Sequence, residues 1–348
     1  KSINKAHAGF LSLEMSDLTI ADLTVSERSG IANFNFDKNT KIGTVVIGSG
    51  VSSTNVRNAM INITSDSSCE GFAEGGDFCG SQTNYKIYFA VEFNRSSISE
   101  GTWANNSLFD GVNKSSGKNS GAYFSFDTTK NSEVTYRISI SYVSIDNAKA
   151  NLKASRIEGG INAYKKNAES AWDSSLAKIK IESPNNDRKT QFYTHLYHSL
   201  IHPNIVSDIN GEYIGADYRV HKTKLEDQYS SFSVWDTYRT QAQLLAMLYP
   251  RKSSDMMQSL VDFATQSGGY GRWILANVET GIMQGDPTPT LISNSFAFGA
   301  TNFDLKTAYE YMNQGATIPK LRSQDHEIRP YLKEYIRDGH TFSSMMLE

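Results

Sequence analysis

The spacing of hydrophobic and polar residues changes character part-way along this chain of 348 residues. In the first part, short segments alternate between apolar and polar positions and are rich in β-branched and aromatic residues. Such alternation is typical of antiparallel strands with one buried face. We therefore expect an antiparallel β-sandwich over residues 1–150. The predicted strands are Ile31–Phe36, Gly43–Ile47, Tyr85–Phe93, Gly121–Phe126 and Val134–Val143, with further alternation from Leu11 to Val25.

Farther along the chain, apolar residues recur at the spacing of amphipathic helices. All seven prolines lie at or after Pro184, which marks the same change of character. We expect a helical linker over residues 151–184 and an all-α domain over residues 185–348. The predicted helices are Asn147–Ile179, Asp187–Ile201, Thr237–Leu248, Lys252–Gln266, Thr288–Phe298, Leu305–Gln314 and Pro330–Arg337, and a last one that Thr341 would cap, with Phe342, Met345 and Met346 on its apolar side.

Charge and hydropathy exclude two classes of function. The net charge is −3 and the pI is about 6.2. Because no basic block is present, nucleic acid is not a predicted partner. No apolar run reaches the length of a membrane-spanning helix. The chain shows no signal peptide at Lys1 and does not begin with Met, so we expect a mature product or a piece of a longer protein.

Two cysteines, Cys69 and Cys79, lie in one glycine-rich loop. A disulfide would close this loop in an oxidising compartment, and two free thiols are an equal alternative. Without histidines nearby, the pair is a poor zinc site. Four Asn-x-Ser/Thr sequons would carry glycans only in a protein secreted by a eukaryote. The sequons begin at Asn62, Asn94, Asn105 and Asn113.

The segment Ser233–Arg239 concentrates chemistry suited to a sugar. It places the indole of Trp235, the carboxylate of Asp236 and the guanidinium of Arg239 within five residues. An aromatic face packs against the C–H groups of a sugar ring, and charged groups bind its hydroxyls. The alternative is a buried Trp beside a surface Asp–Arg pair at spacing i, i+3.

A second group of candidates follows a glycine-rich turn and Trp273. Asn277, Glu279 and Asp286 occupy loop positions, and polar residues on such loops commonly face a pocket. Capping of the loop itself is the alternative. Asp236, Glu279 and Asp286 are also candidates for the acid and base of an inverting glycosidase, although their spacing assigns neither role.

Two further motifs resemble metal sites only in composition. The loop Asp208–Asp217 lacks the ligand spacing of a calcium loop, so we favour a β-hairpin turn at Asn210–Gly211. His195, His198 and His202 would share one helix face. No nearby carboxylate or Cys completes a metal site, so we favour a buried packing role for these histidines.

Several co-linear motifs together are more specific than any one of them. They are Gly75–Gly80 and Tyr85–Phe93 in the first domain, and Phe192–Asn204, Ser207–Tyr213, Phe232–Arg239 and Ala276–Thr280 with its continuation to Gly285 in the second. In this order, over most of the chain, they resemble family 92 of the glycoside hydrolases, the calcium-dependent exo-acting α-mannosidases.

The resemblance implies a β-sandwich followed by an (α/α)6 barrel, with residues 185–348 as the N-terminal half of that barrel. It also implies a mannose pocket between the domains, a Ca²⁺ cofactor that helps to hold and distort the sugar, and hydrolysis with inversion. Asp236 is the best candidate for a contact to a sugar hydroxyl. The substrate-binding residues that the resemblance implies are Trp235, Asp236 and Arg239, with Asn277, Glu279 and Asp286 lining the same cavity.

The chain also departs from the family. A Glu-Gly-Asn-Ala-Trp-Gln-Tyr-like motif holds the family's general acid, and an Asn-Asp-Asp-x-Gly-Gln-Met-Ser-like motif holds its base and calcium ligands. Neither motif is present, and an early Gly- and Pro-containing segment is missing before Lys1. We expect the acid, base and calcium ligands beyond Glu348, on a continuation or a second chain that completes the barrel. We therefore expect the 1–348 polypeptide alone to be inactive.

The expected partners are mannose-containing glycans of the N-glycan or mannan type, and the expected location is secreted, periplasmic or at the cell surface. Two alternatives stay open. One is a non-catalytic carbohydrate-binding or surface interaction protein on the same scaffold. The other is a different glycosidase or phosphorylase that joins a sandwich to an (α/α)6 barrel.

Overall fold

A computed structural model describes residues 2–48, 54–81 and 83–341. The helix expected after Thr341 lies outside the described residues. Contacts divide the chain into two compact units: Lys1–Gly76 with Lys86–Tyr197, which we call the strand unit, and Asp77–Tyr85 with His198–Glu348, which we call the helical unit. The short segment Asp77–Tyr85 thus leaves the strand-rich region of the sequence and packs with the later helices.

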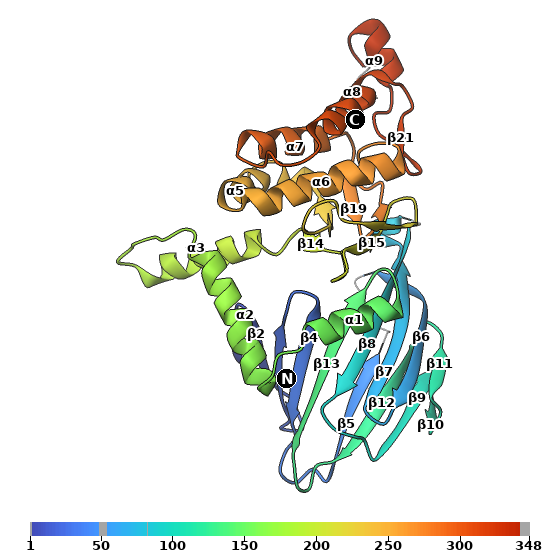
Figure 1. The fold of residues 1–348 in the computed structure, drawn as a ribbon, viewed down its shortest axis with the longest axis vertical. Helices are drawn as coiled ribbons and strands as arrows, with labels where there is room; N and C mark the ends of the chain where they lie inside the picture. The colour runs from blue at the N-terminus through green and yellow to red at the C-terminus, as the bar shows by residue number, and fades with distance from the viewer. Residues whose placement is uncertain (1, 49–53, 82, 342–348) are drawn as a thin grey trace. The chain divides into compact units, whose positions relative to one another are not determined.

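The strand unit contains two antiparallel sheets (Figure 1). In spatial order, the nine-stranded sheet consists of β1 (Ser2–His7), β2 (Phe10–Glu14), β3 (Ile20–Val25), β4 (Ser29–Asn35), β13 (Glu133–Ser141), β8 (Asn84–Phe93), β7 (Ser68–Gly76), β6 (Asn55–Ser65) and β11 (Lys114–Ser116). The four-stranded sheet consists of β10 (Ser107–Asp110), β9 (Ser99–Ala104), β12 (Ser120–Asp127) and β5 (Ile42–Gly48). The predicted antiparallel sandwich is confirmed.

The two sheets share one apolar core. Phe124 and Phe126 of β12 are fully buried, and their ring centroids lie 4.7 and 5.2 Å from that of Phe93 on β8. Along β5, inward Val45 alternates with outward Val46, which is 63 % exposed. The period-two pattern of the sequence therefore separates a core face from an outer face on this sheet.

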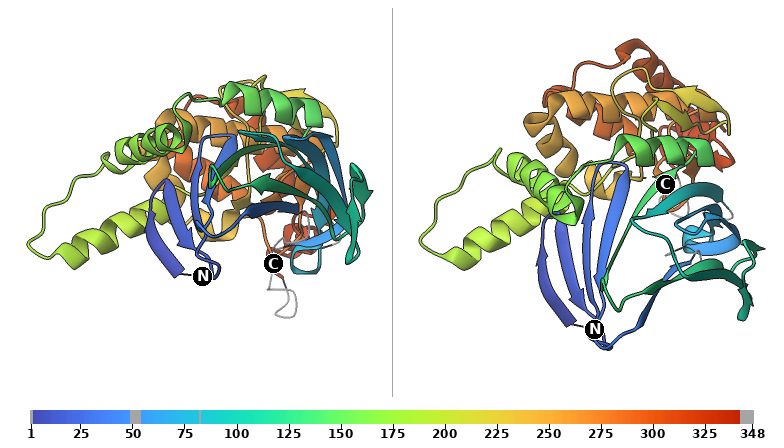
Figure 2. Two further views of the ribbon diagram at one scale, coloured as in Figure 1. Left: turned by 90° about the horizontal axis from the view of Figure 1, so that it is seen from below. Right: turned by 60° about the horizontal axis from the view of Figure 1, so that its bottom comes forward.

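Three helices complete the strand unit: α1 (Ile145–Ala154), α2 (Gly160–Leu176) and α3 (Asn186–Ser199), of which the unit includes residues up to Tyr197. The predicted helix Asn147–Ile179 is divided into two, because Gly159 and Gly160 adopt positive φ angles of 105° and 65°. Figure 2 shows a long loop between α2 and α3, and the rings of Trp172 on α2 and Tyr197 on α3 are centred 4.6 Å apart.

The helical unit is built around α6 (Pro250–Ser267), which packs against α5 (Gln241–Leu248) and α7 (Thr288–Ala297). Pro250 begins α6 and Gly268, at φ 96°, ends it, as expected for these residues at helix termini. The remaining helices are the short η1 (Phe78–Gly80) and α4 (Val234–Thr237), together with α8 (Leu305–Thr317) and α9 (Leu332–Asp338).

Short strands connect these helices. They are β14 (Asn204–Ile205), β15 (Glu212–Ile214), β16 (Val220–Lys222), β17 (Tyr229–Ser230), β18 (Phe232–Ser233), β19 (Trp273–Leu275), β20 (Val278–Glu279), β21 (Arg322–Ser323) and β22 (His326–Glu327). The predicted helix Thr237–Leu248 starts later than expected, because Thr240 adopts a non-helical φ of −149° between α4 and α5. None of the helices in the described ranges has the length and apolarity to cross a membrane.

Substitutions on the two faces of the four-stranded sheet should differ greatly in their effect on the free energy of unfolding, because only one face belongs to the shared core. Phe124→Ala should lower the free energy of unfolding by about 3–5 kcal/mol, because it leaves a cavity among Phe93 and its neighbours. Val46→Ala, on the outer face, is the matched control and should change it by less than about 0.5 kcal/mol. Urea titration followed by far-ultraviolet circular dichroism measures both. Equal effects would contradict this assignment of the faces.

Candidate active site

The segment Ser233–Arg239 crosses from a strand into a short helix. Phe232 and Ser233 of β18 pair with Ile274 and Trp273 of β19. Val234 begins α4 and is fully buried in the core of the helical unit. Because Val234 anchors this turn, the next residues are carried toward the surface, and Asp236 is exposed.

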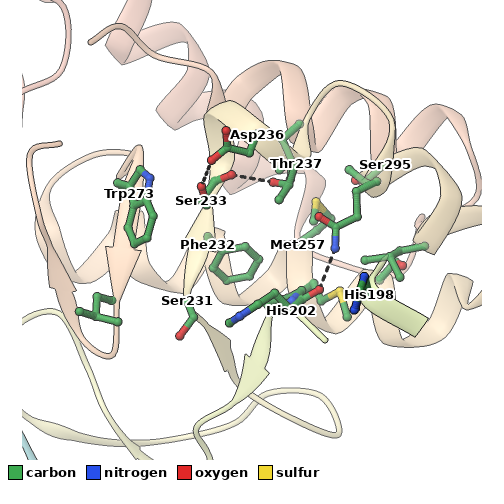
Figure 3. A pocket seen from close by; sticks show the side chains of 18 residues that line it. His198, His202, Ser231, Phe232, Ser233, Asp236, Thr237, Met257, Trp273 and Ser295 are labelled. Atoms are coloured by element: carbon green, nitrogen blue, oxygen red, sulfur yellow. Dashed lines mark hydrogen bonds between the residues drawn. The ribbon is translucent and has the colours of Figure 1, made fainter. Parts of the chain in front are cut away.

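A cavity of about 430 Å³ opens beside this turn. Ser233 and Asp236 lie on one part of its wall with Trp273, and Ser231, His202 and His198 lie at another part of the lining (Figure 3). Most of the remaining lining is apolar and comes from α5, α6 and α7. The cavity therefore combines apolar walls with a few polar groups, as small-molecule sites commonly do.

The carboxylate of Asp236 accepts a hydrogen bond from the Ser233 hydroxyl, and the hydroxyl of Thr237 donates to the Ser233 carbonyl at 3.1 Å (Figure 3). Asp236 forms no ion pair with any residue in the described ranges, and the guanidinium of Arg239 instead lies 5.0 Å from the ring of Tyr238. Asp236 thus offers a charged acceptor at the cavity. An acceptor of this kind forms strong hydrogen bonds with hydroxyl donors.

Trp235 and Arg239, the other two candidates in this segment, are not part of the cavity lining among the described residues. The indole N–H of Trp235 donates to the carbonyl of Gln284, and its ring meets Tyr238 edge-on at 5.9 Å. Trp273 of β19 provides the indole at the cavity instead. Its ring lies 4.8 Å from that of Phe78 in the segment Asp77–Tyr85.

Glu279 is almost completely buried, with 1 % of its surface exposed. Its carboxylate accepts hydrogen bonds from the backbone N–H groups of Arg272 at 2.7 Å, Trp273 at 3.3 Å and Gly281 at 2.8 Å. Burial raises the pKa of Glu279, although these donors lower it. Glu279 therefore fixes the backbone conformation at Trp273 and its neighbours.

Glu279 also belongs to the lining of a second cavity, of about 780 Å³. That cavity includes Cys79 and Thr83 from the segment Asp77–Tyr85, together with Gln324 and His326. Its walls are more polar than those of the cavity at Asp236. No local pattern of the sequence predicts this cavity, because Asp77–Tyr85 and His326 are more than two hundred residues apart.

Asn277 is also buried, and the side chain of Asp286 is only 5 % exposed. Asn277 donates to the carbonyl of Gly215 at 3.3 Å, and Asp286 accepts from Arg329 at 3.0 Å. Burial raises the pKa of Asp286, while the charges of Arg329 and Arg272 lower it. All three form internal contacts, and none of them belongs to the described lining of the cavity at Asp236. That Asn277, Glu279 and Asp286 line a sugar site stays a prediction.

The three histidines are not a buried group. His195, His198 and His202 are exposed, and α3 ends at Ser199, so they do not share one helix face. The predicted packing role is therefore wrong. In the part of the chain that the structure describes, no group of three or more His, Cys, Asp or Glu side chains could hold a metal ion.

The loop Asp208–Asp217 contains the predicted turn but not the predicted hairpin. Asp208 N–H donates to the Glu212 carbonyl and Gly211 N–H to the Asp208 carbonyl, both at 2.8 Å, with Gly211 at φ 80°. The hairpin of β15 and β16 turns later, and there Asp217 binds the ring of His221 at 2.9 Å. Cys69 and Cys79 are both free, the first buried and the second exposed.

Comparison with known proteins decides the family. Residues 147–345 match the Glycosyl hydrolase family 92 catalytic domain, and residues 1–141 match the Glycosyl hydrolase family 92 N-terminal domain. The chain belongs to glycosyl hydrolase family 92. No curated protein matches it in a sequence comparison.

Solved structures of the family share its fold. A family GH92 alpha-mannosidase from Bacteroides thetaiotaomicron superposes with a TM-score of 0.84 at 24 % identity, covering 94 % of this chain and 44 % of that protein. A family GH92 inverting mannosidase from Bacteroides thetaiotaomicron VPI-5482 superposes with a TM-score of 0.86 at 21 % identity, covering 97 % of this chain and 45 % of that protein. The family-92 chain therefore spans less than half the length of these two structures.

The ion pair between the buried carboxylate of Asp286 and the partly exposed guanidinium of Arg329 predicts a pH-dependent effect of Arg329→Ala on stability. Arg329→Ala should destabilise the helical unit by about 2–3 kcal/mol near pH 7. This cost is smaller than that of breaking a fully buried ion pair, because the Arg329 side chain is partly exposed to solvent. Without Arg329 the folded-state pKa of Asp286 rises further above its unfolded value, so the folded state binds the proton more tightly. The loss should therefore shrink as the pH falls toward about 4.

Urea titration at several pH values measures this dependence. Arg329→Lys is the matched control, because it keeps the positive charge, and Asp286→Asn should rescue part of the Arg329→Ala defect at neutral pH. A defect of the same size at every pH would show that Arg329 contributes through packing and not through the carboxylate.

Proposed function

We propose that this family-92 chain works in a glycoside hydrolase that releases terminal α-linked mannose from glycans with inversion. Membership of the family supports the glycosidase class. The single observation that supports a role for a particular residue is the exposed carboxylate of Asp236 at the cavity. It accepts a hydrogen bond from the Ser233 hydroxyl and forms no ion pair with any described residue. A mannose hydroxyl is the kind of donor that such a carboxylate binds.

In this proposal the residues of this chain position the sugar. Asp236 accepts a hydrogen bond from a hydroxyl of the terminal mannose, and Ser233 orients the carboxylate. The ring of Trp273 packs against the apolar C–H face of the sugar, supported from behind by Phe78. Holding the sugar in one orientation lowers the entropic part of the barrier to hydrolysis.

The bond-breaking step needs a general acid and a general base far enough apart to admit a water molecule. Glu279 and Asp286 are unsuited to these roles, because backbone N–H groups and Arg329 occupy their carboxylates. We propose that residues outside Lys1–Glu348 supply the acid, the base and the ligands of a calcium ion. No group of three or more His, Cys, Asp or Glu side chains that could hold a metal ion is present in the described residues, so we assign no step to the metal.

The role of Asp236 can be tested in the complete enzyme. Asp236→Ala should lower kcat/KM for a terminal α-mannoside by about 10- to 100-fold, because it removes a charged hydrogen bond to the sugar. The melting temperature should stay unchanged, since the side chain is exposed. Asp338→Ala, an exposed carboxylate at the end of α9, is the matched control. Near-normal turnover by Asp236→Ala would remove Asp236 from the sugar site.

Calcium dependence is a separate test. Treatment of the complete enzyme with EDTA should abolish mannose release, and excess Ca²⁺ should restore it. Mg²⁺ should not restore it, because Mg²⁺ demands shorter bonds and octahedral geometry. Activity that persists in EDTA would contradict the proposed calcium dependence while leaving the glycosidase proposal in place. Activity on another glycoside and none on mannosides would instead favour a different glycosidase specificity.

A further inference from the structure

The outer face of the four-stranded sheet carries two large aromatic side chains. The strand register places Trp103 of β9 opposite Gly121 of β12, and Tyr123 of β12 opposite Gly101 of β9. Their neighbours on β12, Ala122 and Phe124, point into the core and are fully buried. Trp103 and Tyr123 therefore lie diagonally on the opposite face, away from the core.

Three glycines make room for these rings. A Cβ on Gly121 would lie 2.2 Å from Cζ2 of Trp103, and a Cβ on Gly48 would lie 3.3 Å from the same atom. A Cβ on Gly101 would lie 2.7 Å from Oη of Tyr123. The indole of Trp103 on β9 thus extends across β12 toward β5, and it occupies the space that side chains on Gly121 and Gly48 would need. Atoms of both rings therefore lie directly over these glycines of the sheet.

Polar groups border the two rings. The hydroxyl of Tyr123 donates to the exposed carboxylate of Asp110 on β10 at 2.5 Å. On the other side of Tyr123, the hydroxyls of Thr44 and Ser125 bind each other at 2.9 Å. The face therefore combines flat apolar plates with groups that donate to and accept from hydroxyls, which is the chemistry that sugar rings require.

The charge of this face indicates a neutral ligand. The hydrogen bond to Asp110, together with burial and the nearby charge of Glu100, raises the pKa of Tyr123 to about 12. The phenol is therefore neutral at physiological pH, and the charges beside it are negative. Such surroundings disfavour a phosphate, a sulfate or an acidic sugar.

The size of this face indicates a small ligand and not a protein. Its apolar side chains are the two rings together with Ile42, which is 58 % exposed, and Val46 and Leu108, which are both 63 % exposed. A stable protein interface needs about 800 Å² and some 20–30 residues on each partner. Five side chains fall far below that requirement, and they match the extent of a short sugar chain.

We propose that this face, which we call the aromatic platform (Trp103, Tyr123 and Asp110 over Gly48, Gly101 and Gly121), binds a neutral oligosaccharide. Two successive sugar rings pack on the indole and the phenol ring, and Asp110 accepts a hydrogen bond from a hydroxyl. The platform belongs to the strand unit, whereas Asp236 belongs to the helical unit. The proposal therefore does not depend on the function proposed for the cavity at Asp236.

Binding of four neutral trisaccharides to the 1–348 chain tests the proposal: mannotriose, cellotriose, xylotriose and galactotriose. Saturation-transfer NMR detects contact, and calorimetric titration gives Kd. At least one of the four should bind to the wild-type chain. Trp103→Ala should weaken that binding at least tenfold, in line with the loss of an aromatic stacking partner. Trp103→Ala should have the same effect in an Asp236→Ala background, in which the cavity at Asp236 no longer contributes its carboxylate.

Two further variants separate binding from folding. Phe109→Ala is the matched control, because Phe109 is an exposed aromatic of the same sheet, 40 % exposed, whose partner Thr102 lies on the core side. It should bind as the wild type does. Asp110→Ala should weaken binding several-fold without altering the melting temperature, and it decides the matter if Trp103→Ala does not fold.

Three results would overturn the proposal. The first is a wild-type chain that binds none of the four sugars. The second is binding that survives both Trp103→Ala and Asp110→Ala, which would mean that the rings only cover the glycines beneath them. The third is binding that is lost in Asp236→Ala, which would place the sugar in the helical unit.

Discussion

The carboxylate of Glu279 is the internal contact on which the site in the helical unit depends. It accepts hydrogen bonds from the backbone N–H groups of Arg272, Trp273 and Gly281, and so fixes both ends of the β19–β20 turn. Gly271 has to be glycine, because a Cβ there would lie 2.4 Å from the Glu279 carboxylate. A buried carboxylate is stable only when such donors satisfy it, so this region of the helical unit has little freedom to rearrange.

The same contact extends to distant parts of the chain. Gln324 accepts from the backbone N–H of Glu279 at 2.7 Å and donates to the carbonyls of Ala216 and Asn277 at 2.7 and 3.1 Å. One amide side chain thus joins three loops that are up to about a hundred residues apart in sequence. These hydrogen bonds keep the loops in one arrangement and so keep Trp273 in one orientation. A fixed aromatic ring is what binding of the apolar C–H face of a sugar requires.

The two candidate sugar surfaces each present an indole ring, and they differ in what supports that ring from below. At the cavity, Trp273 lies beside an exposed carboxylate, and its indole is backed by Phe78. On the aromatic platform, Trp103 is backed by the bare backbone of Gly48 and Gly121. In each case the indole is supported on one side, so a ligand would meet a rigid aromatic surface and little side-chain entropy would be lost on binding.

Much of the fold follows from the sequence alone. Period-two alternation determined the faces of strands such as β5 and β12, and apolar spacing determined helices such as α6 and α8, because burial of one face imposes these periods. The family also follows from the sequence, because its motifs are short continuous segments that can be read without the structure. Tertiary structure alone decided which polar groups meet. Glu279 and Asp286 have the residue types of catalytic acids, but backbone donors and Arg329 occupy them, whereas Asp236 stays accessible because Val234 anchors its turn in the core. Hydrogen bonds between residues far apart in sequence made that difference, and no local pattern encodes them.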